Sequence, residues 1–436
     1  MGLQAQRITA RSLIAGAEMT NAQGPEGPYA KALAADRHGD AAATRALLRE
    51  AADAGDDRAR LPLAGTLIDG RGGPVEPEEA VRALEPLESS NPIARRMIVT
   101  ALALGPGGWG AAALRRAAHG RTGEREAALE LGLLAADTDQ ETGRLLLVRA
   151  AGQGSGHALA ALARLAASDG AVWPGLVQQI EALGRTGHPL AGPLKTLLSG
   201  LPETAAPPAA GEPDWDAAAQ AVGSGPPARA GTPLSGSPAI AAHPGAVSPI
   251  LCDYLLGATW PMLQRAKIFD ASIGRTREDP HRRAHAASIP QSMMDLPMLS
   301  IQARMAAAAC MPLDRAEALA VLVYQPGDEY RAHFDFFSDD DGWASAEIAA
   351  RGQRAATALA ALNTQYEGGE TVFPRAQVSW RGALGDVLTF RSLLEDGSAD
   401  LKTLHAGAPV ASGWKALASL WLRERAVGPD GAAVRR

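Results

Sequence analysis

The aromatic residues of this 436-residue chain are concentrated in its C-terminal half. Of its 8 Trp, 5 Tyr and 6 Phe, only Tyr29, Trp109, Trp173 and Trp215 precede residue 249. Aromatic and β-branched residues favour strands, whereas Ala, Leu, Arg and Glu favour helices. The sequence therefore predicts a multidomain protein whose halves differ in architecture, with short alanine-rich helices first and a strand-rich domain after them.

Length, charge and cysteine content narrow the class of protein further. A chain of 436 residues is long enough for two or three domains. Its two cysteines, Cys252 and Cys310, exclude a disulfide framework and fit a reducing compartment. The net charge of −6 argues against a nucleic-acid partner, and we find neither a signal peptide nor a membrane-spanning apolar run. We therefore expect a soluble cytoplasmic protein without a membrane partner, and we leave its oligomeric state open.

An alanine-rich phrase recurs through the first 200 residues. Its copies are REAADAG at 49–55, RALEPLE at 82–88, RRAAHG at 115–120, VRAAGQG at 148–154 and IEALGRTG at 180–187. The aligned alanines, Ala51, Ala83, Ala117, Ala150 and Ala182, are separated by 32, 34, 33 and 32 residues. Such a period is typical of stacked helix–turn–helix repeats, so residues 1–200 are predicted to form an all-α helical-repeat solenoid. The alternative is an ordinary alanine-rich helical domain with coincidental spacing.

The amino-acid composition changes twice after residue 200. Residues 201–248 are rich in Pro, Gly and Ala, which predicts a linker interrupted by a short helix around DWDAAAQAV. Beyond it, two apparent amphipathic helices, SPILCDYLLGATWPMLQRAKI and MLSIQARMAAAACMP, precede the strand-like runs LAVLVYQ, YRAHFDFF, TALAALN, ETVFP, GDVLTF and ALASLWLRER. Residues 249–425 are therefore expected to form an α+β domain, an antiparallel barrel or jelly roll with supporting helices, before a tail over 426–436.

His333 and Asp335 are candidate metal ligands. Both lie on a predicted strand, where a side-chain period of two places them on one face and Phe334 on the other. Two such ligands and one distant His make the facial triad of non-haem Fe(II) oxygenases, which leaves one side of the metal open. A second His-x-Asp pair, His38 and Asp40, lies in the helical half and is interpreted as a solvent-exposed turn, because helical residues i and i+2 diverge by about 200°.

The motifs around this pair resemble the catalytic domain of prolyl 4-hydroxylases. The resemblance is carried by LVYQPGDEYRAHFDFF, RGQRAATALAALNTQYEGGETVFP, GALGDVLTF and EDGSADLKTLHAGAPVASGWKALASLWL, in that order. It implies a double-stranded β-helix and an enzyme that uses Fe(II), 2-oxoglutarate, O₂ and L-ascorbate. In the first half, LAGTLIDGRGGPVEPEEAVRALEPL is similar to a Sel-one-like repeat, a relative of the tetratricopeptide repeat.

The resemblance also implies roles for individual residues. It places the catalytic iron ligands at His333, Asp335 and His405. It places four cofactor-binding positions around 2-oxoglutarate: Lys415, which would pair with the distal carboxylate, and Tyr324, Thr357 and Trp421.

Some positions depart from the family pattern. One further pair of histidines has the spacing of a metal-binding pair. Family members often carry an aromatic residue where this chain has Ala361, and an aromatic and Asn where it has Arg391 and Ser392. These departures leave iron binding intact but leave the shape of the pocket, and hence the substrate, open. His281 and His285 stand at helical i, i+4 spacing, but their surroundings are typical of a polar loop and offer no further ligands.

Three hypotheses for the function follow from these observations. The first is hydroxylation of a peptidyl proline at C4, with the helical repeats recruiting a protein substrate or partner. The second keeps the same oxygenase chemistry but acts on a small molecule or a non-proline residue. The third is a repeat scaffold whose oxygenase domain is degenerate, and the complete triad with Lys415 argues against it.

Overall fold

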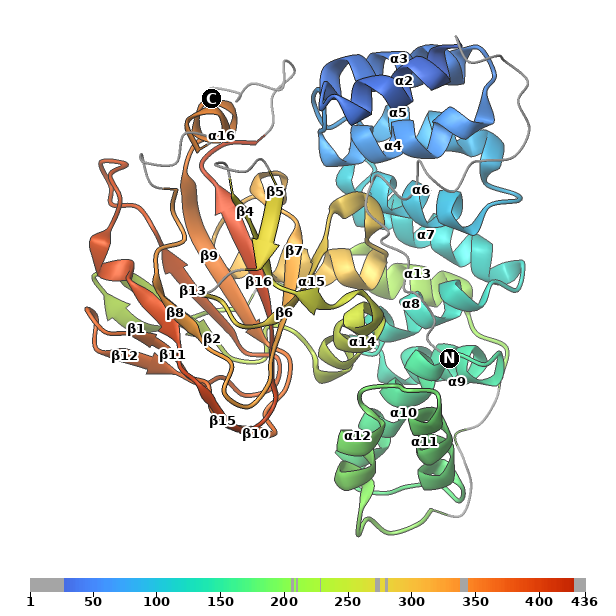
Figure 1. The fold of residues 1–436 in the computed structure, drawn as a ribbon. Coiled ribbons are helices and arrows are strands. Elements are labelled where there is room, and N and C mark those ends of the chain that lie inside the picture. The colour runs from blue at the N-terminus through green and yellow to red at the C-terminus, as the bar shows by residue number, and fades with distance from the viewer. Residues whose placement is uncertain are drawn as a thin grey trace.

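The computed structural model describes residues 27–204, 208, 211–227, 229–270, 275–278, 281–337 and 344–426, and the N-terminal segment and the tail after 426 lie outside this range. A column of helices lies beside two layers of β-sheet, with two further helices between them (Figure 1). In the part of the chain described here, no helix is long and apolar enough to span a membrane.

The column is built from short helices joined by tight turns. They are α2 (Pro28–Arg37), α3 (Ala41–Asp53), α4 (Arg60–Asp69), α5 (Pro77–Leu84), α6 (Pro92–Leu104), α7 (Gly108–Arg121), α8 (Arg125–Ala135), α9 (Gln140–Gly152), α10 (Gly156–Asp169), α11 (Leu176–Arg185), α12 (Ala191–Leu198) and α13 (Trp215–Gly223). Several begin at a side chain that accepts hydrogen bonds from the first-turn N–H groups, as Asn91, Asp139 and Ser155 do. The recurring alanines fall on α3, α5, α7, α9 and α11, so the sequence period matches alternate helices. Assignment to the Sel-one-like family remains a prediction.

The strands of the second half form a large and a small sheet. The large sheet has eight strands in the order β1-β2-β13-β9-β16-β7-β6-β3, and the small one has the order β12-β11-β14-β8. The runs expected to be strands are confirmed as β7 (Leu319–Tyr324), β8 (Tyr330–His333), β9 (Arg354–Ala361), β11 (Thr371–Phe373), β13 (Val387–Arg391) and β16 (Lys415–Arg423). The others are β1 (Thr232–Gly236), β2 (Ala239–His243), β3 (Gln264–Arg265), β4 (Lys267–Asp270), β5 (Arg275–Glu278), β6 (His285–Ile289), β10 (Tyr366–Gly368), β12 (Val378–Trp380), β14 (His405–Gly407) and β15 (Val410–Gly413).

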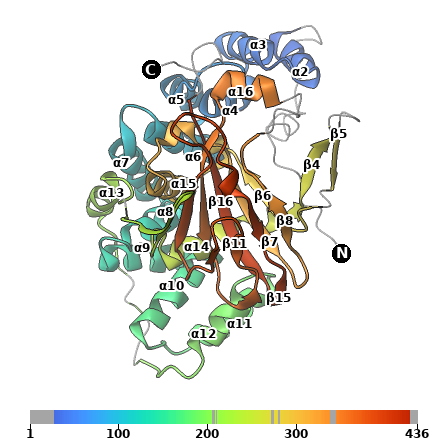
Figure 2. The ribbon, with the colours of Figure 1, turned by 90° about the vertical axis from the view of Figure 1, so that its left-hand side faces the viewer.

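The two sheets face each other across an apolar core. This core includes Leu322 from β7, Leu359 from β9, Phe373 from β11, Phe390 from β13 and Leu417 from β16. The strand pairs are antiparallel throughout both sheets. The architecture is that of a jelly roll, and Figure 2 shows the sheets from the side opposite the helical column.

The expected linker over 201–248 is wrong over residues 232–243, which belong to the large sheet. The short helix around DWDAAAQAV is confirmed as α13, but it packs against α7 and α8 rather than standing alone. Residues 232–243 form the β1–β2 hairpin, and β2 pairs with β13 over Val387–Phe390 in the large sheet. Composition missed these elements because Pro, Gly and Ser also occur in the turns and at the edge of a sheet.

Helices α14 (Pro249–Thr259) and α15 (Leu296–Ala308) lie between the column and the large sheet (Figure 1). They were predicted to be amphipathic, but both are buried on nearly all sides. One face of α15 contacts α6 and α8, and another contacts β9, β13 and β16. The polar-loop interpretation of the His285 region is also wrong, because residues 285–289 form β6, paired with β7.

Polar contacts connect the two halves alongside this apolar packing. Arg164 on α10 donates two hydrogen bonds to Asp253 on α14, at 2.8 and 3.0 Å. Arg304 on α15 donates to Asp137, after α8, at 2.7 Å. Arg96 on α6 donates to the carbonyl oxygen of Met294 at 2.8 Å. Because these groups are buried or half-buried, their pairing fixes the relative placement of the halves.

A substitution at Gly120 tests the packing of α13. A Cβ atom at Gly120 on α7 would lie 2.1 Å from the ring of Trp215 on α13. We expect Gly120→Ala to lower the free energy of unfolding by about 1–3 kcal/mol, because the ring has to move. Urea denaturation measures the change. Gly192→Ala on α12, where nothing lies within 4 Å, is the matched control and should stay within about 1 kcal/mol of the parent. Equal stability of the two variants would contradict this packing.

Candidate active site

Three side chains from two neighbouring strands and the loop that follows one of them meet at the small sheet. His333 is the last residue of β8, and His405 is the first residue of β14. The antiparallel register of these strands places the two histidines directly opposite each other. Asp335 lies two residues beyond the end of β8, so the prediction that both residues of the pair lie on the strand holds for His333 only. The chain nevertheless turns the Asp335 carboxylate toward both imidazoles.

The distances among these groups suit a shared metal ion. Nε2 of His333 is 3.6 Å from Oδ1 of Asp335, and Nε2 of His405 is 3.7 Å from Oδ2. One ligand atom from each residue lies within 4.8 Å of the others. Among the described residues, no other group of three His, Cys, Asp or Glu side chains comes this close.

Nδ1 of each imidazole is hydrogen-bonded to a backbone carbonyl oxygen. Nδ1 of His333 is 2.8 Å from the carbonyl oxygen of Arg331, and Nδ1 of His405 is 2.9 Å from that of Thr403. A carbonyl oxygen only accepts hydrogen bonds, so Nδ1 carries the proton in both rings and the Nε2 lone pair faces Asp335. Two neutral imidazoles and one carboxylate on one side of a cavity are the donor set that non-haem Fe(II) requires, so these residues fit the ion.

The electrostatics of the group favour an ionised Asp335. Burial alone would raise the pKa of this carboxyl, but the nearby His405 and His333 and a hydrogen bond from Thr357 hold it well below its usual range. The Thr357 hydroxyl donates to Oδ2 of Asp335 at 2.6 Å. Burial also lowers the pKa of His405, which keeps the ring available as a neutral ligand. The Thr357 hydroxyl therefore orients the carboxylate toward the two histidines, and the low pKa of Asp335 suits a metal ligand.

Thr357 was predicted to contact the cofactor, and the structure places it elsewhere. It is fully buried behind Asp335 and is not among the residues that line the cavity at the site. Its contribution is therefore to hold the carboxylate. The spacing of the motif cannot distinguish a residue in the cavity wall from one directly behind it.

Lys415 and Tyr324 line the same cavity and are almost fully buried, so they mark its inner end, and their binding of 2-oxoglutarate stays a prediction. They face each other across β16 and β7, and Nζ of Lys415 lies 5.5 Å from the centre of the Tyr324 ring. Nζ donates a hydrogen bond to the carbonyl oxygen of Gly369 at 2.6 Å. Burial lowers the pKa of Lys415 to about 8, and the nearby Glu370 partly opposes this change. The ammonium group is an isolated buried cation, which suits a carboxylate ligand.

Trp421 also lines the cavity, as predicted. Its ring is covered on one side by the guanidinium of Arg354, 3.9 Å from the ring centre. Arg354 is itself held by Glu317 through two hydrogen bonds, at 2.9 and 2.8 Å. The indole N–H of Trp421 is buried without a hydrogen-bond partner. Such an orphaned donor in a cavity wall fits an oxygen-rich ligand, and 2-oxoglutarate is one.

Two residues at the site were not identified from the sequence. The ring of Tyr330 stacks on the imidazole of His333, with centres 3.5 Å apart and planes 19° apart. The guanidinium of Arg282 lies over the Tyr330 ring, 5.3 Å from its centre, and Arg282 and Tyr330 both line the cavity. Tyr330 stands inside the motif YRAHFDFF, three residues before His333, and this proximity was an available signal. Arg282 belongs to the segment that was interpreted as a loop.

The two other histidine pairs stand outside the group formed by His333, Asp335 and His405. His38 and Asp40 lie in the exposed turn between α2 and α3, where Asp40 accepts a hydrogen bond from the N–H of Ala43. His281 and His285 take part in no metal-ligating group among the described residues.

Together, the donor set, the buried lysine and the jelly roll define the class of Fe(II)- and 2-oxoglutarate-dependent oxygenases. Comparison with known proteins agrees. Residues 319–423 match the model of the 2OG-Fe(II) oxygenase superfamily. Prolyl 4-hydroxylase 1 of Arabidopsis thaliana is 30% identical over 207 residues, which are 44% of this chain and 71% of that protein. Probable prolyl 4-hydroxylase 3 of the same plant is 31% identical over 190 residues, 39% of this chain and 64% of that protein.

Among solved structures, the viral collagen prolyl hydroxylase of Paramecium bursaria Chlorella virus-1 is 26% identical, with a TM-score of 0.32, and covers 42% of this chain and 95% of that one. From the sequence relationship, the chain belongs to the prolyl 4-hydroxylase-like 2OG-Fe(II) oxygenases. It is a dioxygenase that uses Fe(II), 2-oxoglutarate and O₂, and ascorbate is typical of its family. The hypothesis of a degenerate scaffold is therefore dropped.

The role of Thr357 is tested by removing its hydroxyl group. Thr357→Val keeps the shape of the side chain but leaves Asp335 Oδ2 without its donor, so we expect Fe(II) affinity to fall by about 10- to 100-fold. Anaerobic titration with Fe(II), or with Co(II) as a spectroscopic probe, measures this. Thr357→Ser retains the hydroxyl and should bind metal like the parent. Parental affinity in Thr357→Val would show that the hydrogen bond does not position the carboxylate.

The lowered pKa of Lys415 predicts a pH dependence of 2-oxoglutarate binding. Below about pH 8 the ammonium is charged, and above it the free protein loses the charge that an ordinary lysine would keep. The Kd for 2-oxoglutarate should therefore be constant at lower pH and rise up to about tenfold per pH unit above the pKa. Calorimetry over this range measures it. Lys415→Arg keeps its charge, so its Kd should lack this slope, and a slope that persists in it would exclude Lys415 as the titrating group.

Proposed function

We propose that this dioxygenase hydroxylates a peptidyl proline at C4 and that its N-terminal helices recruit the protein that carries the proline. The observation that carries the proposal is the His333, Asp335 and His405 donor set beside the buried Lys415, in a chain similar to proteins named prolyl 4-hydroxylases. The same site chemistry on a small molecule or a non-proline residue is the alternative outcome of the test below.

In this proposal, His333, Asp335 and His405 hold Fe(II) on one side only. When bound, the ion supplies the activation of O₂, through which 2-oxoglutarate becomes succinate and CO₂ and one oxygen atom enters the substrate C–H bond. The Nδ1 hydrogen bonds of both histidines keep Nε2 free of a proton, and Thr357 keeps the Asp335 carboxylate turned inward. These contacts preset the ligand positions before the ion binds.

The inner end of the cavity binds the cosubstrate in this proposal. Lys415 pairs with the distal carboxylate of 2-oxoglutarate, and the Tyr324 ring borders the same carboxylate. The free N–H of Trp421 is a further donor in the cavity wall. Because Lys415 and Tyr324 are almost fully buried, water is excluded around this ion pair, which strengthens it.

The outer end of the cavity is proposed to receive the proline. The Tyr330 ring stacks on His333, and the Arg282 guanidinium lies 5.3 Å from the centre of that ring, where both residues line the cavity. The edge of the ring offers an apolar contact for a pyrrolidine, and the guanidinium donates to the carbonyl groups of a peptide. A peptide that reaches this stack would place its proline next to the metal ligands.

The proposal predicts peptide-dependent turnover of 2-oxoglutarate. With Fe(II) and ascorbate present, a proline-containing peptide should stimulate succinate formation and gain the mass of one oxygen atom at C4 of proline. His333→Ala should abolish both signals, because it removes one of the three ligands. His38→Ala, from the exposed and unrelated pair, is the control and should remain fully active. A product formed only on a small molecule or on another residue would favour the alternative substrate class.

A further inference from the structure

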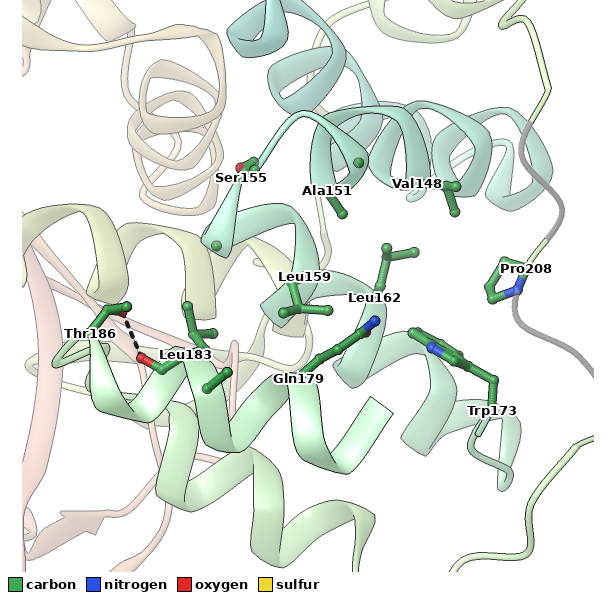
Figure 3. A pocket seen from close by; sticks show the side chains of 14 residues that line it. Val148, Ala151, Ser155, Leu159, Leu162, Trp173, Gln179, Leu183, Thr186 and Pro208 are labelled. Carbon is green, nitrogen blue, oxygen red and sulfur yellow. Dashed lines mark hydrogen bonds between the residues drawn. The ribbon is translucent and has the colours of Figure 1, made fainter. Parts of the chain in front are cut away.

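Two hollows of the molecule differ in the charge of their walls. The hollow bounded by α9, α10 and α11 has a volume of about 610 Å³, and Leu159, Leu162 and Trp173 form part of its wall (Figure 3). None of the described residues that line it carries a charge. The wall of the active-site cavity, by contrast, contains two cationic side chains, Lys415 and Arg282. The active-site cavity is therefore the place where the charge of a substrate can be recognised.

Arg282 differs from the arginines around it because its side chain has no acidic partner. Nη2 of Arg283 is 3.4 Å from Oε1 of Glu329, and Nη1 of Arg265 is 3.6 Å from Oδ1 of Asp328. Within the described part of the chain, no carboxylate forms an ion pair with Arg282. Its Nε atom is buried without a hydrogen-bond partner, although the side chain as a whole is only half-buried. Arg282 is therefore a cation in the cavity wall without a counter-ion.

The guanidinium of Arg282 lies close to the metal ligands. It is 5.3 Å from the centre of the Tyr330 ring, and the centre of that ring is 3.5 Å from the centre of the His333 ring. Burial raises the pKa of Tyr324, and the charge of Arg282 opposes this rise, so its field extends to the inner end of the cavity. Each residue of an extended peptide spans about 3.3 Å. A side chain within two residues of a proline at the metal ligands can therefore reach Arg282.

The charges of the occupied site balance without Arg282. The positive charges of Fe(II) and Lys415 equal the negative charges of Asp335 and the 2-oxoglutarate dianion, and both histidine ligands are neutral. Arg282 adds a positive charge that no other described residue of the cavity wall offsets. A half-buried cation without a counter-ion is unfavourable once bound substrate excludes water from it. A negative charge on the substrate would therefore stabilise the complex.

We propose that Arg282 selects substrates that carry a carboxylate within two residues of the proline, from an Asp or Glu side chain or from the C-terminus of a peptide. The guanidinium binds both carboxylate oxygens, in a charge-assisted pair that is stronger than a hydrogen bond to a neutral carbonyl group. The Tyr330 ring lies against the guanidinium and limits its orientations. The inference names the substrate class of the site described above and rests on the proposed function.

Binding of labelled peptides to the full chain tests the proposal. The protein is loaded with Fe(II) and 2-oxoglutarate in the absence of O₂, so that no turnover occurs, and fluorescence anisotropy measures the Kd. Two short peptides with capped ends carry one central proline, which is flanked on both sides by Glu in the first and by Gln in the second. The Glu peptide should bind at least about tenfold more tightly, because a charge-assisted pair replaces a neutral contact.

A third peptide distinguishes the two sources of the carboxylate. It has Gln beside the proline and a free C-terminal carboxylate two residues after it. Tight binding of the Glu peptide alone would assign the ligand to an acidic side chain, and tight binding of the third peptide alone would assign it to the C-terminus. Equal Kd values for all three peptides would overturn the proposal.

Substitutions of Arg282 should remove and then reverse the preference. In Arg282→Gln the Kd values of the Glu and Gln peptides should come within about twofold of each other. Arg282→Glu should favour a Lys-flanked peptide over the Glu peptide, a reversal that the loss of a merely structural contact would not produce. Because no described residue pairs with the Arg282 side chain, neither variant leaves a buried partner unpaired. Arg265→Gln, whose half-exposed guanidinium lies beside Asp328, is the matched control and should keep the parental preference. Equal losses in Arg282→Gln and Arg265→Gln would contradict the proposal.

Two further measurements separate this inference from the proposed function. The Kd of 2-oxoglutarate should be the same in Arg282→Gln as in the parent, and a rise in this Kd without a change in peptide preference would mean that Arg282 serves the cosubstrate and would overturn the inference. With O₂ present, the Glu peptide should show a lower KM than the Gln peptide at similar kcat. Hydroxylation of both peptides with the same KM would leave the proposed function intact and the inference wrong. Preferred binding of the Glu peptide without hydroxylation of its proline would support the carboxylate site and contradict the proposed function.

Discussion

The burial of α15 between two layers is the constraint on which both halves of the molecule depend. Nearly every residue from Leu296 to Ala308 is inside, because α6 and α8 cover one side and the large sheet covers the other. A helix without a solvent face has to pair its polar groups internally, and Arg304 does so with Asp137. One continuous apolar core therefore extends from the helical column into the sheet that carries Lys415, so the column supports the catalytic half from behind.

The active site also buries charged side chains, and each has neighbours that influence its pKa. Burial raises the pKa of the Asp335 carboxyl, and His405, His333 and the Thr357 hydroxyl lower it below its usual range. Burial lowers the pKa of Lys415, whose Nζ donates to the carbonyl oxygen of Gly369 and lies near the Tyr324 ring and Glu370. A dicarboxylate bound beside Lys415 would place a negative charge next to this buried ammonium group.

The strands and the metal triad could be predicted from the sequence, because each leaves a local pattern. Apolar runs and turn residues mark β7, β9 and β16, and the His-x-Asp motif with a later His and Lys carries the site. Contacts between distant segments leave no such pattern. The role of Thr357 depends on which side of β9 faces Asp335, and β6 is an Ala-Ala-Ser strand whose stability comes from its neighbour β7 rather than from its own composition. The burial of α15 depends on a second layer that its sequence does not specify.

Because of the β1–β2 hairpin, the catalytic domain begins earlier in the chain than its composition indicates. By pairing with β13, β2 satisfies the N–H and C=O groups of Val387–Phe390, which would otherwise form an exposed edge. If the domain were transferred with a boundary at residue 249, β13 would therefore become an exposed edge strand with unpaired backbone groups, next to the core around Phe390. A transferable oxygenase module therefore has to begin before Thr232, because the segment that resembles a linker in composition covers one edge of the large sheet.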